Sequence, residues 1–427
     1  MTQPRLTQRI FLTSLIVAAF FVECAVSPVA ISATVDWPGY RGPTGDGHAV
    51  AENLPHDLNQ PANLVWKTPI PGTGWSTPVV LGDQVWMTTA TDGGKSLRAI
   101  CVRTSSGRLV HDIEIFAVEK PAEIHKKNSH ASPTPAIETG RLYVHFGTNG
   151  TAAIDTATGK IVWRNSDHTL EHMVGPGSSP VLYKDLVVLT CDGADVQYSV
   201  GLDTATGKER WKTPRSGVLR DNPDVKKSFA TPAIFRVGDQ DELVTPAADH
   251  VYAYDPATGG ELWQLDYDGF SVVPRPVAAH GLVFVCTGFN TPKLLAIKQG
   301  GVGKLPPSAI AWEEKSQIPA TPALLVVGEE LYVMSDRGVA TCLDAKSGRE
   351  LWRHRIGGNF SASPLLADGL IIFASEEGVV TLVEPGKSYR EVAVSDLGVQ
   401  IMASPIAFGS TLIIRTAEDI RLFRKPQ

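Results

Sequence analysis

Cysteine is scarce in this chain and forms no recognisable motif. Its five cysteines are never adjacent and never form a Cys-x-x-Cys pair, the spacing on which thiolate metal sites and thioredoxin-like redox sites depend. Cys101, Cys191, Cys286 and Cys342 each stand alone in a strand-like apolar stretch. We expect them to be small buried side chains, with disulfides in an exported protein as the open alternative. The sequence predicts no metal site.

Basic blocks and long apolar runs are missing as well. The formal net charge is −6 and lysines never cluster beyond isolated pairs, which argues against general nucleic-acid binding. After residue 22 no apolar run is long enough to cross a bilayer, so we predict no transmembrane segment. Sustained 3.6-residue periodicity is also absent after the first 33 residues, which predicts almost no helix. With 43% hydrophobic and 20% charged residues, the composition is that of a globular protein.

The first 33 residues have the pattern of a secretory signal peptide. Arg5 and Arg9 precede an apolar run at 10–22, and small residues then lead to a cleavage box at 30–32. We predict cleavage near residues 32–33 and an exported protein, periplasmic or secreted. Cys24 leaves lipid anchoring open, although the adjacent Glu23 is a poor match to the small residue of a lipobox.

A nine-residue pattern ending in tryptophan recurs through the rest of the chain. Asp and Thr side chains can bond the backbone of a tight turn, Gly can take a positive φ, and Trp is a large wedge for packing on a neighbouring sheet. Each copy therefore predicts a strand–turn–strand unit. The four clear copies are DTATGKIVW at 155–163, DTATGKERW at 203–211, DPATGGELW at 255–263 and DAKSGRELW at 344–352. A looser copy at 297–312 contains an insertion before its Trp.

A proline opens each repeat and fixes the number of units. Eight such prolines recur at intervals averaging about 47 residues, the period of a four-stranded propeller blade. Short apolar and β-branched strands joined by polar turns follow each proline, which predicts antiparallel hairpin-connected blades. The prolines are Pro78, Pro135, Pro180, Pro232, Pro276, Pro322, Pro364 and Pro405.

The two ends of the repeat region complement each other. The last unit, residues 403–424, supplies three strands, and the stretch at 64–68 supplies a single strand before any full repeat. Pairing them would close the ring and hide exposed strand edges. We therefore predict an all-β fold, an eight-bladed β-propeller at 64–427. Residues 34–63, rich in Gly and Pro at their start, form an irregular N-terminal arm.

These repeats resemble the PQQ-like, or quinoprotein-alcohol-dehydrogenase-like, β-propeller family. The resemblance covers roughly residues 64–424, and the opening WPGYRGPTGDG at 37–47 resembles secreted members from planctomycete-type bacteria. It implies one of two activities. One branch holds pyrroloquinoline quinone (PQQ) with Ca²⁺ under a ring of adjacent cysteines, and the other consists of non-catalytic propellers such as an outer-membrane assembly scaffold. Fold alone does not choose between them.

The residues favour the non-catalytic branch. This sequence has no adjacent cysteines and no haem-binding CxxCH motif. Calcium needs six to eight oxygen ligands, and the nearest candidates, the acidic pairs at 221/224 and 266/268, have the spacing of ordinary solvated loops. We expect no bound cofactor. A PQQ-dependent oxidoreductase of alcohols or sugars remains the alternative function, and a polysaccharide-active or lyase-type propeller is a third.

Candidate binding residues lie on the loops that enter each repeat. The position five residues before each proline is polar in seven of eight repeats (Thr73, His130, Gly175, Lys227, Ser271, Gln317, Asn359 and Gln400), and we expect this set to ring the mouth of the axial channel. His130 is a candidate general base or ligand, the roles in which proteins most often use an imidazole, and Arg275, between two prolines, suits anion capture. Trp75 and Arg220 complete the candidates. We predict a monomeric binding or scaffold module for an envelope protein or a small-molecule ligand.

Overall fold

The structure, a computed structural model, describes residues 1–2 and 37–426. The predicted signal peptide, its cleavage site and Cys24 lie outside the described residues. Residues 34–427 group into one compact unit. Within the described ranges, no helix is long and apolar enough to cross a membrane. The only helices there are five three-residue 3₁₀ segments: η1 (Pro61–Asn63), η2 (Asp92–Gly94), η3 (Gly147–Asn149), η4 (Pro223–Val225) and η5 (Pro307–Ala309).

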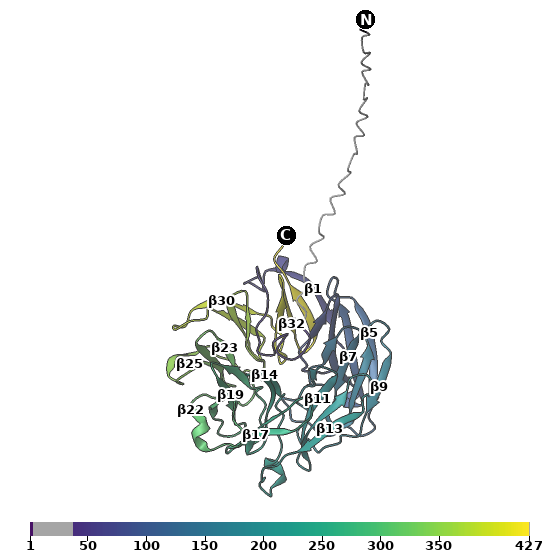
Figure 1. The fold of residues 1–427 in the computed structure, drawn as a ribbon. Coiled ribbons are helices and arrows are strands. Elements are labelled where there is room, and N and C mark those ends of the chain that lie inside the picture. Colours follow the sequence, from purple (N-terminus) through teal and green to yellow (C-terminus); the bar gives the residue numbers. More distant parts are fainter. Residues whose placement is uncertain (3–36, 427) are drawn as a thin grey trace. The chain divides into compact units, whose positions relative to one another are not determined.

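Eight antiparallel sheets surround a central axis, which confirms the predicted eight-bladed β-propeller (Figure 1). Each blade has strands A to D, counted from the axis outward, and the A strands of neighbouring blades contact one another. Blade 1 contains β2 (Val79–Leu81), β3 (Gln84–Thr91), β4 (Ser96–Arg103) and β5 (Leu109–Ala117). Blade 2 contains β6 (Ala136–Glu138), β7 (Arg141–His145), β8 (Thr151–Asp155) and β9 (Ile161–Asn165). Blade 3 contains β10 (Val181–Tyr183), β11 (Leu186–Asp192), β12 (Gln197–Asp203) and β13 (Glu209–Pro214).

Blades 4 to 7 repeat this order. Blade 4 contains β14 (Ala233–Val237), β15 (Gln240–Pro246), β16 (His250–Tyr254) and β17 (Glu261–Asp266). Blade 5 contains β18 (Val277–Ala279), β19 (Leu282–Cys286), β20 (Leu294–Lys298) and β22 (Ile310–Glu314). Blade 6 contains β23 (Leu325–Val327), β24 (Glu330–Met334), β25 (Val339–Asp344) and β26 (Glu350–Arg355). Blade 7 contains β27 (Leu365–Ala367), β28 (Leu370–Ala374), β29 (Val379–Val383) and β30 (Glu391–Asp396).

Blade 8 joins the two ends of the described chain. Its strands are β31 (Ile406–Phe408), β32 (Thr411–Arg415), β33 (Asp419–Phe423) and, as strand D, β1 (Leu64–Pro69). β1 pairs antiparallel with β33, from Leu64 opposite Phe423 to Pro69 opposite Asp419. The predicted closure of the ring by residues 64–68 is therefore confirmed, and it removes the exposed edges that an open array would leave.

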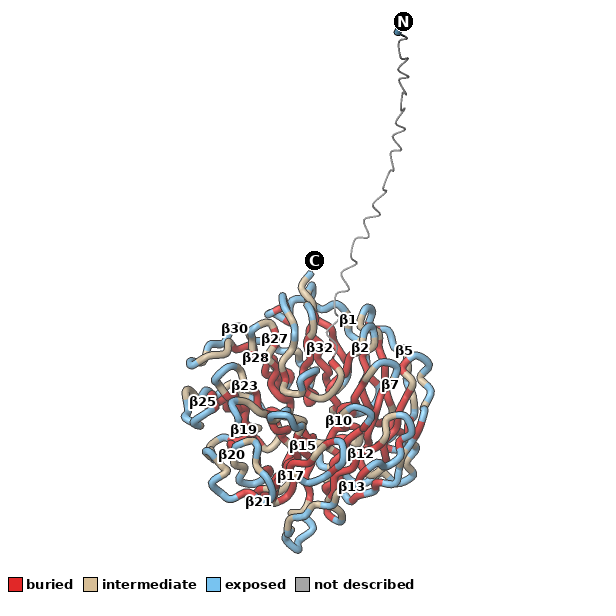
Figure 2. Tube along the Cα trace, viewed as in Figure 1, coloured by how far each residue is buried: buried red, intermediate tan, exposed pale blue. Residues whose placement is uncertain are grey.

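Burial falls from the inner strands to the outer ones, as their sequences require. The middle strands are near-continuous apolar runs that are packed on both faces, and β11 is buried along its whole length. The outer strands alternate, and β13 buries Trp211 between exposed neighbours. Figure 2 shows this as buried strands inside and exposed loops and outer edges. Cys101, Cys191, Cys286 and Cys342 are all free and buried, as the sequence predicted.

The repeated turn forms the bonds that its sequence predicts. In blade 3, Asp203 Oδ1 accepts from the backbone N–H of Thr206 at 2.9 Å and from the Thr206 hydroxyl at 2.8 Å. Gly207 then takes φ +70°, a conformation that L side chains rarely adopt. The same Asp and hydroxyl pairing recurs in the turns after β8, β16 and β25. These local bonds explain why the pattern survives in blade after blade.

The tryptophan of an outer strand packs on the turn of the next blade. Trp163 in β9 donates its indole N–H to the Thr204 carbonyl at 2.9 Å, and its ring lies against Gly207, where a Cβ would come within 2.5 Å. The predicted role of Trp as a wedge between sheets is confirmed. The same bond crosses three other blade junctions, from Trp66 to Thr104, from Trp312 to Ala345 and from Trp352 to Gly386.

Replacing Trp163 with phenylalanine should lower the free energy of unfolding by about 1–2 kcal/mol, because a junction hydrogen bond and part of the ring contact are lost. Trp211 is the matched control. It is equally buried and packs on Gly259 in the same way, but its indole nitrogen has no hydrogen-bond partner among residues 37–426. Urea unfolding of Trp163→Phe and Trp211→Phe should differ by about 1 kcal/mol. Equal losses would contradict a role for the indole bond.

The insertion in blade 5 adds a strand to its neighbour. Between β20 and β22 the chain leaves its own blade, and β21 (Gly303–Lys304) pairs in parallel with β17, making blade 4 five-stranded. Leu305 donates its N–H to the Gln264 carbonyl at 2.8 Å. The interrupted turn motif at 297–312 predicts an insertion but not this pairing, because two residues carry no strand pattern.

The N-terminal arm crosses the ring between distant blades. Trp37 exchanges backbone hydrogen bonds with Val80 in blade 1, and Pro38 accepts one from blade 2. Further along, Ala49 bonds Leu366 in blade 7, and Glu52 bonds Gly409 in blade 8. Between these points, the Tyr40 carbonyl accepts a hydrogen bond from Arg275 at the start of blade 5. The arm therefore belongs to the propeller and links blades 1 and 2 with blades 5, 7 and 8.

Candidate functional site: an axial cavity on the D–A face

A cavity of about 1320 Å³ lies on the propeller axis. All eight blades contribute to its lining. The lining comes from the segments that lead from strand D of one blade to strand A of the next and from several B–C turns. We call the side of the ring that carries these segments the D–A face; the A–B and C–D turns lie on the opposite face. Exposed residues such as Phe289 and Gln317 line the cavity, so it opens on the D–A face.

Two tiers of side chains build the wall, because the approach to each strand A is extended and alternate residues point the same way. The tier nearest the floor is the residue before each opening proline, a Ser or Thr in seven of eight blades. Six of these line the cavity: Thr77, Thr134, Ser179, Thr231, Thr321 and Ser404. The tier above lies two residues earlier: Trp75, Ser132, Gly177, Phe229, Val273, Ser361 and Met402.

The hydroxyl tier also links the blades. The N–H of Thr77 donates to Thr134 Oγ1 at 3.0 Å, and that of Thr134 donates to Ser179 Oγ at 2.9 Å. Ser179 continues the chain to Thr231 at 3.0 Å. Each bond satisfies a buried backbone donor across a blade junction and contributes about 0.5–1.5 kcal/mol. The floor of the cavity is consequently held by the ring itself.

Arg275 replaces the hydroxyl of this tier in blade 5. It is 7% exposed; its Nε donates to the Pro232 carbonyl at 3.1 Å, and its Nη1 donates to the Tyr40 carbonyl in the arm. Tyr40 itself lines the cavity. Burial lowers the pKa of Arg275 to about 10, and nearby Arg41 lowers it further, against the opposing effects of Tyr40 and Asp46. The structure thus places this candidate in the floor, holding the arm.

Three of the other candidates line the cavity. Lys227 is buried and donates from Nζ to the Asp224 carbonyl at 2.6 Å, and Gln317 is exposed at the mouth. Trp75 belongs to the second tier, and its indole nitrogen is buried without a hydrogen-bond partner. These three come from blades 1, 4 and 6, so the structure brings them to a common space but not into contact.

The remaining candidates lie away from the cavity lining. His130 bonds the Ala122 carbonyl at 2.9 Å, and Asn359 bonds Glu377 at 2.8 Å. Arg220 pairs with Asp249 at 2.5 Å and lies over the Phe270 ring. Gln400 is exposed, and its carbonyl accepts from Ala417. The position five residues before the proline therefore contributes only Lys227, Ser271 and Gln317 to the cavity.

Sequence reasoning missed the charged residues of the B–C turns and neighbouring loops. Lys293 and Arg337 come from the B–C turns of blades 5 and 6, and Lys127 and Lys315 come from D–A segments. The signal for the two tiers was present, since Ser or Thr precedes seven of the eight prolines. No repeat position marks the B–C residues, because these turns differ in length from blade to blade.

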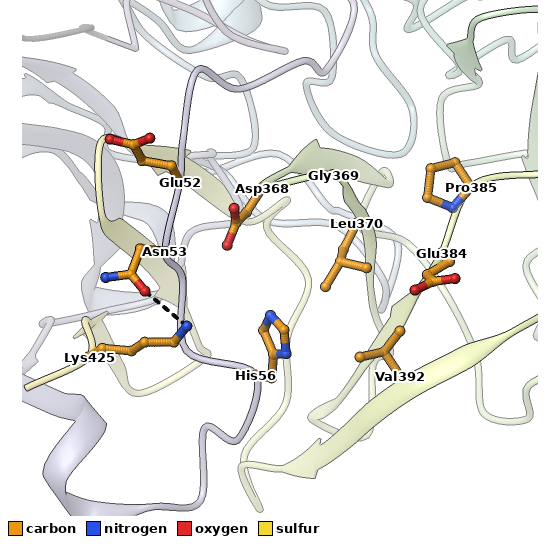
Figure 3. Close-up of a pocket in the computed structure, with 10 residues that line it drawn as sticks. All are labelled: Glu52, Asn53, His56, Asp368, Gly369, Leu370, Glu384, Pro385, Val392 and Lys425. Atoms are coloured by element: carbon orange, nitrogen blue, oxygen red, sulfur yellow. Dashed lines mark hydrogen bonds between the residues drawn. The ribbon is translucent and has the colours of Figure 1, made fainter.

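A second pocket of about 700 Å³ lies between the arm and blade 7 (Figure 3). Glu52, Asn53 and His56 come from the arm, and Asp368 and Glu384 come from blade 7. Asp368 accepts the backbone N–H of Leu54 at 2.8 Å, while Glu384 pairs with Arg390. Lys425 donates to Asn53 at 3.0 Å. These carboxylates already hold the arm and the outer turn in place, so this pocket is part of the arm's seat.

Histidines gather beside the cavity wall between blades 2 and 3. His145 is buried against the Thr151 hydroxyl at 2.8 Å, and His172 accepts the Thr148 N–H at 3.1 Å. Burial, followed by the nearby His172 and His168, lowers the pKa of His145 to about 3. Burial lowers the pKa of His172 to about 4, with Asp195 opposing it. Both imidazoles are therefore neutral structural groups at pH 7.

This cluster should make the fold acid-sensitive. The folded chain binds protons at His145 and His172 less tightly than the unfolded chain, whose histidines have the ordinary pKa of 6.5. The free energy of unfolding is therefore highest above pH 6.5 and falls as the pH drops towards 4, by about 1 kcal/mol per pH unit for each histidine. Urea unfolding at pH 7.0, 6.0 and 5.0 measures the slope. His145→Gln should flatten it, whereas His56→Gln, on the exposed arm, should not; an unchanged slope in His145→Gln would refute this origin.

The donor set of the cavity does not fit a calcium-held quinone. Only two carboxylates, Asp224 and Asp336, line it, and Asp336 Oδ2 already accepts the Ala320 N–H at 2.7 Å. Calcium requires six to eight oxygens. Across residues 1–2 and 37–426, no group of three or more His, Cys, Asp or Glu side chains is placed to hold a metal ion.

Comparisons with known proteins match the repeat region of this chain to a known family. The family model described as outer membrane protein assembly factor BamB matches residues 56–236 and 298–389. The BamB of Xanthomonas campestris is 27% identical over 261 residues, covering 58% of this chain and 59% of that protein. The BamB of Shewanella oneidensis is 21% identical over 266 residues, covering 57% and 61%. The chain thus spans about three fifths of the length of the curated relatives it matches.

Solved structures share the fold at low sequence identity. A quinohemoprotein alcohol dehydrogenase from Comamonas testosteroni has a TM-score of 0.69 at 11% identity, covering 92% of this chain and 80% of that one. BamB from Moraxella catarrhalis has a TM-score of 0.55 at 12% identity, covering 79% and 98%. Such likeness shows the fold alone. The family model, which matches more than half of the residues, shows more: the chain belongs to the PQQ-like β-propeller family described as outer membrane protein assembly factor BamB.

Proposed function

We propose that this chain is an exported, non-catalytic binding propeller that holds part of an envelope protein on its D–A face and in its axial cavity. The observation that carries the proposal is the construction of the cavity. All eight blades line it, and the arm contributes Tyr40 to its lining, so a bound segment would be surrounded by the whole ring. Its wall is made of hydroxyl and apolar side chains held by blade-to-blade bonds, an arrangement suited to binding.

The names of the two curated relatives support this assignment. Both curated relatives are named outer membrane protein assembly factors, and assembly is a binding task. Residues 1–33 act as a cleaved export signal, residues 34–63 as an arm that belongs to the mature propeller, and residues 64–427 as the propeller itself. The protein works as a monomer in the periplasm or outside the cell. The origin in a planctomycete-type bacterium, suggested by the segment at 37–47, stays a prediction.

Site-specific photo-crosslinking in living cells tests the function. A photoreactive amino acid at Gln317 or Ser361, both of which line the cavity, should give a discrete adduct with an envelope protein. The same amino acid at Lys160 or Thr206, in the turns of the opposite face, is the control and should give none. Adducts only from the control positions would overturn the assignment of the binding face.

A quinone dehydrogenase would behave differently. Purified protein should show no bound-quinone spectrum and no dye reduction with alcohols or sugars after addition of PQQ and Ca²⁺. Either signal would replace the binding function with the oxidoreductase one.

A further inference from the structure

The cavity has the opposite charge from the chain that forms it. The whole sequence carries a formal charge of −6, but five Lys or Arg residues and only two Asp residues line the cavity. Field lines concentrate in a concave site lined by one sign of charge. The five cations are Lys127, Lys227, Lys293, Lys315 and Arg337. Lys127 pairs with Glu376 at 2.9 Å and Lys227 lies 3.8 Å from Asp224, so the argument depends on the other three.

Two of these cations have no partner within the described residues. Lys293 and Arg337 are in neighbouring B–C turns, and neither side chain makes a hydrogen bond or an ion pair in residues 37–426. Lys315, from the D–A segment between the same two blades, pairs with Glu313 at 2.7 Å. Asp336, the adjacent carboxylate, accepts the Ala320 N–H and keeps its negative charge, and Glu313 lies within electrostatic reach of Lys293. The sector formed by blades 5 and 6 therefore presents two cations, Lys293 and Arg337, whose side-chain donors have no bonded partner among the described residues.

Buried arginines around the axis add to this charge. Arg41 and Arg275 in the floor and Arg415 in blade 8 are at most 7% exposed, and within the described chain their side chains donate to carbonyl or hydroxyl oxygens. Arg415, for example, bonds the Ser76 hydroxyl at 2.6 Å. Burial lowers the pKa of Arg415 to about 9, so it remains charged at neutral pH. Asp46 is the carboxylate nearest to the two floor arginines.

Apolar and aromatic side chains share the same wall. Trp75, Phe229, Ile318 and Met402 line the deeper part, and Phe289 is 58% exposed at the mouth, edge-on to Phe270 with their ring centroids 6.4 Å apart. An exposed aromatic at a cavity mouth is a characteristic binding feature. The cavity volume of about 1320 Å³ also exceeds the roughly 300–1,000 Å³ of most small-molecule sites. Its size and mixed lining favour a segment of polymer with both charged and apolar groups.

We propose that the axial cavity receives an acidic polypeptide segment whose carboxylates face Lys293, Lys315 and Arg337 and whose apolar side chains pack on the phenylalanines and Trp75. This inference rests on the proposed binding function and specifies its partner. The carboxylates are attracted by the positive field and fix the register of the segment. The apolar side chains of the bound segment contribute apolar surface that is buried against the cavity wall.

Peptide binding by the purified protein tests this directly. The probe is a fluorescein-labelled 12-residue peptide in which Glu alternates with Leu and Phe, compared with versions that carry Gln or Lys in place of Glu. Fluorescence anisotropy should rank the peptides in the order Glu, Gln, Lys, with the Glu peptide at least about tenfold tighter than the Lys peptide at low salt. Its affinity should fall between 50 and 200 mM NaCl, because exposed charges are screened.

Charge reversal locates the site. Lys293→Glu/Arg337→Glu should weaken the Glu peptide by about tenfold and strengthen the Lys peptide. The matched control is Lys160→Glu/Lys208→Glu, which makes the same change in charge on the opposite face and should leave both affinities within about twofold. Lys293 and Arg337 make no side-chain bonds that folding would lose, and thermal unfolding checks that both double variants are intact.

Four outcomes would overturn the inference: equal binding of the three peptides, an equal effect of the control variant, tighter binding of oligogalacturonate, or tighter binding of PQQ. The last two would assign the cavity to an acidic glycan or to a small carboxylate. Crosslinking separates this failure from that of the proposed function. If Gln317 still captures the same envelope protein in the charge-reversed variant, the binding face stands and the acidic segment is refuted.

Discussion

Replacing Arg215 with leucine should lower the free energy of unfolding by about 3–5 kcal/mol. Arg215 and Asp192 form an ion pair between strands of blade 3, with 1% and 2% of their side chains exposed. Two bonds join them, at 3.0 and 2.7 Å, and Arg215 also donates to Thr245 and Tyr254 of blade 4. Although burial opposes its charge, Asp192 and Tyr254 raise the pKa of Arg215 above its ordinary value.

The size of this effect comes from the partner left behind. Without Arg215, the Asp192 carboxylate is buried with no compensating charge, and its desolvation is not offset. Arg215→Leu/Asp192→Leu should therefore recover most of the stability lost by the single variant. The control is Arg210 in β13, the strand that ends just before Arg215. Arg210 pairs with Asp185 and Asp203 on the surface, and Arg210→Leu should cost less than about 1 kcal/mol.

Urea unfolding of these variants measures the difference. A loss below about 1 kcal/mol for Arg215→Leu, with no recovery in the double variant, would show that the pair contributes nothing to the junction between blades 3 and 4. The result also bears on function, since Arg215 begins the segment that leads to Lys227 in the cavity wall.

The ring could be predicted from sequence because local bonds repeat in every blade. The opening prolines count the sheets, and the turn motif carries its own hydrogen bonds, such as those of Asp203 with Thr206. Closure followed from a missing strand at one end and a spare strand at the other. Each of these signals lies within a few residues along the chain.

What escaped prediction depends on contacts between residues far apart in sequence. The β21 segment is only two residues long and pairs with a neighbouring blade, and the arm is irregular, so its course across the ring leaves no periodic pattern. Arg41 reaches carbonyls more than 280 residues away.

The cavity was predicted in outline but not in its residues. The loops chosen from the sequence do carry it, and Lys227, Gln317 and Trp75 line it. Three of the positions five residues before the proline line the cavity, whereas six of those one residue before it and seven of those three residues before it do so. The regular alternation of the extended approach therefore does not reach back to the fifth position. The sequence suggested that Arg275 binds an anion, but its guanidinium donates hydrogen bonds to the carbonyls of Pro232 and Tyr40.

Arg41→Gly should release the arm from the channel and lower the free energy of unfolding by about 3 kcal/mol. Arg41 is 3% exposed. Its guanidinium donates to the Leu324 carbonyl at 2.9 Å, to the Asp46 carbonyl at 2.8 Å and to the Pro364 carbonyl. Hydrogen bonds from a charged group are worth about 1.5–3 kcal/mol each, and losing them leaves buried carbonyls unsatisfied.

Comparing glycine with alanine is informative because Arg41 has φ +71°. A glycine there relieves backbone strain that the wild type carries, and this relief offsets part of the loss. Arg41→Ala keeps the strain, so it reports the lost side chain and should be about 1 kcal/mol less stable than Arg41→Gly. Arg41→Lys keeps the charge but lacks the planar fork that reaches several carbonyls at once, and should fall between wild type and glycine.

Limited proteolysis followed by mass spectrometry shows where the loss occurs. In Arg41→Gly, cleavage within residues 37–63 should precede cleavage of the blades, because the arm detaches while β1 still closes the ring. A variant as stable and as protease-resistant as wild type would contradict the anchoring role of Arg41. If the arm does detach, Tyr40 leaves the lining of the axial cavity with it, so the same variant should also weaken binding in the cavity.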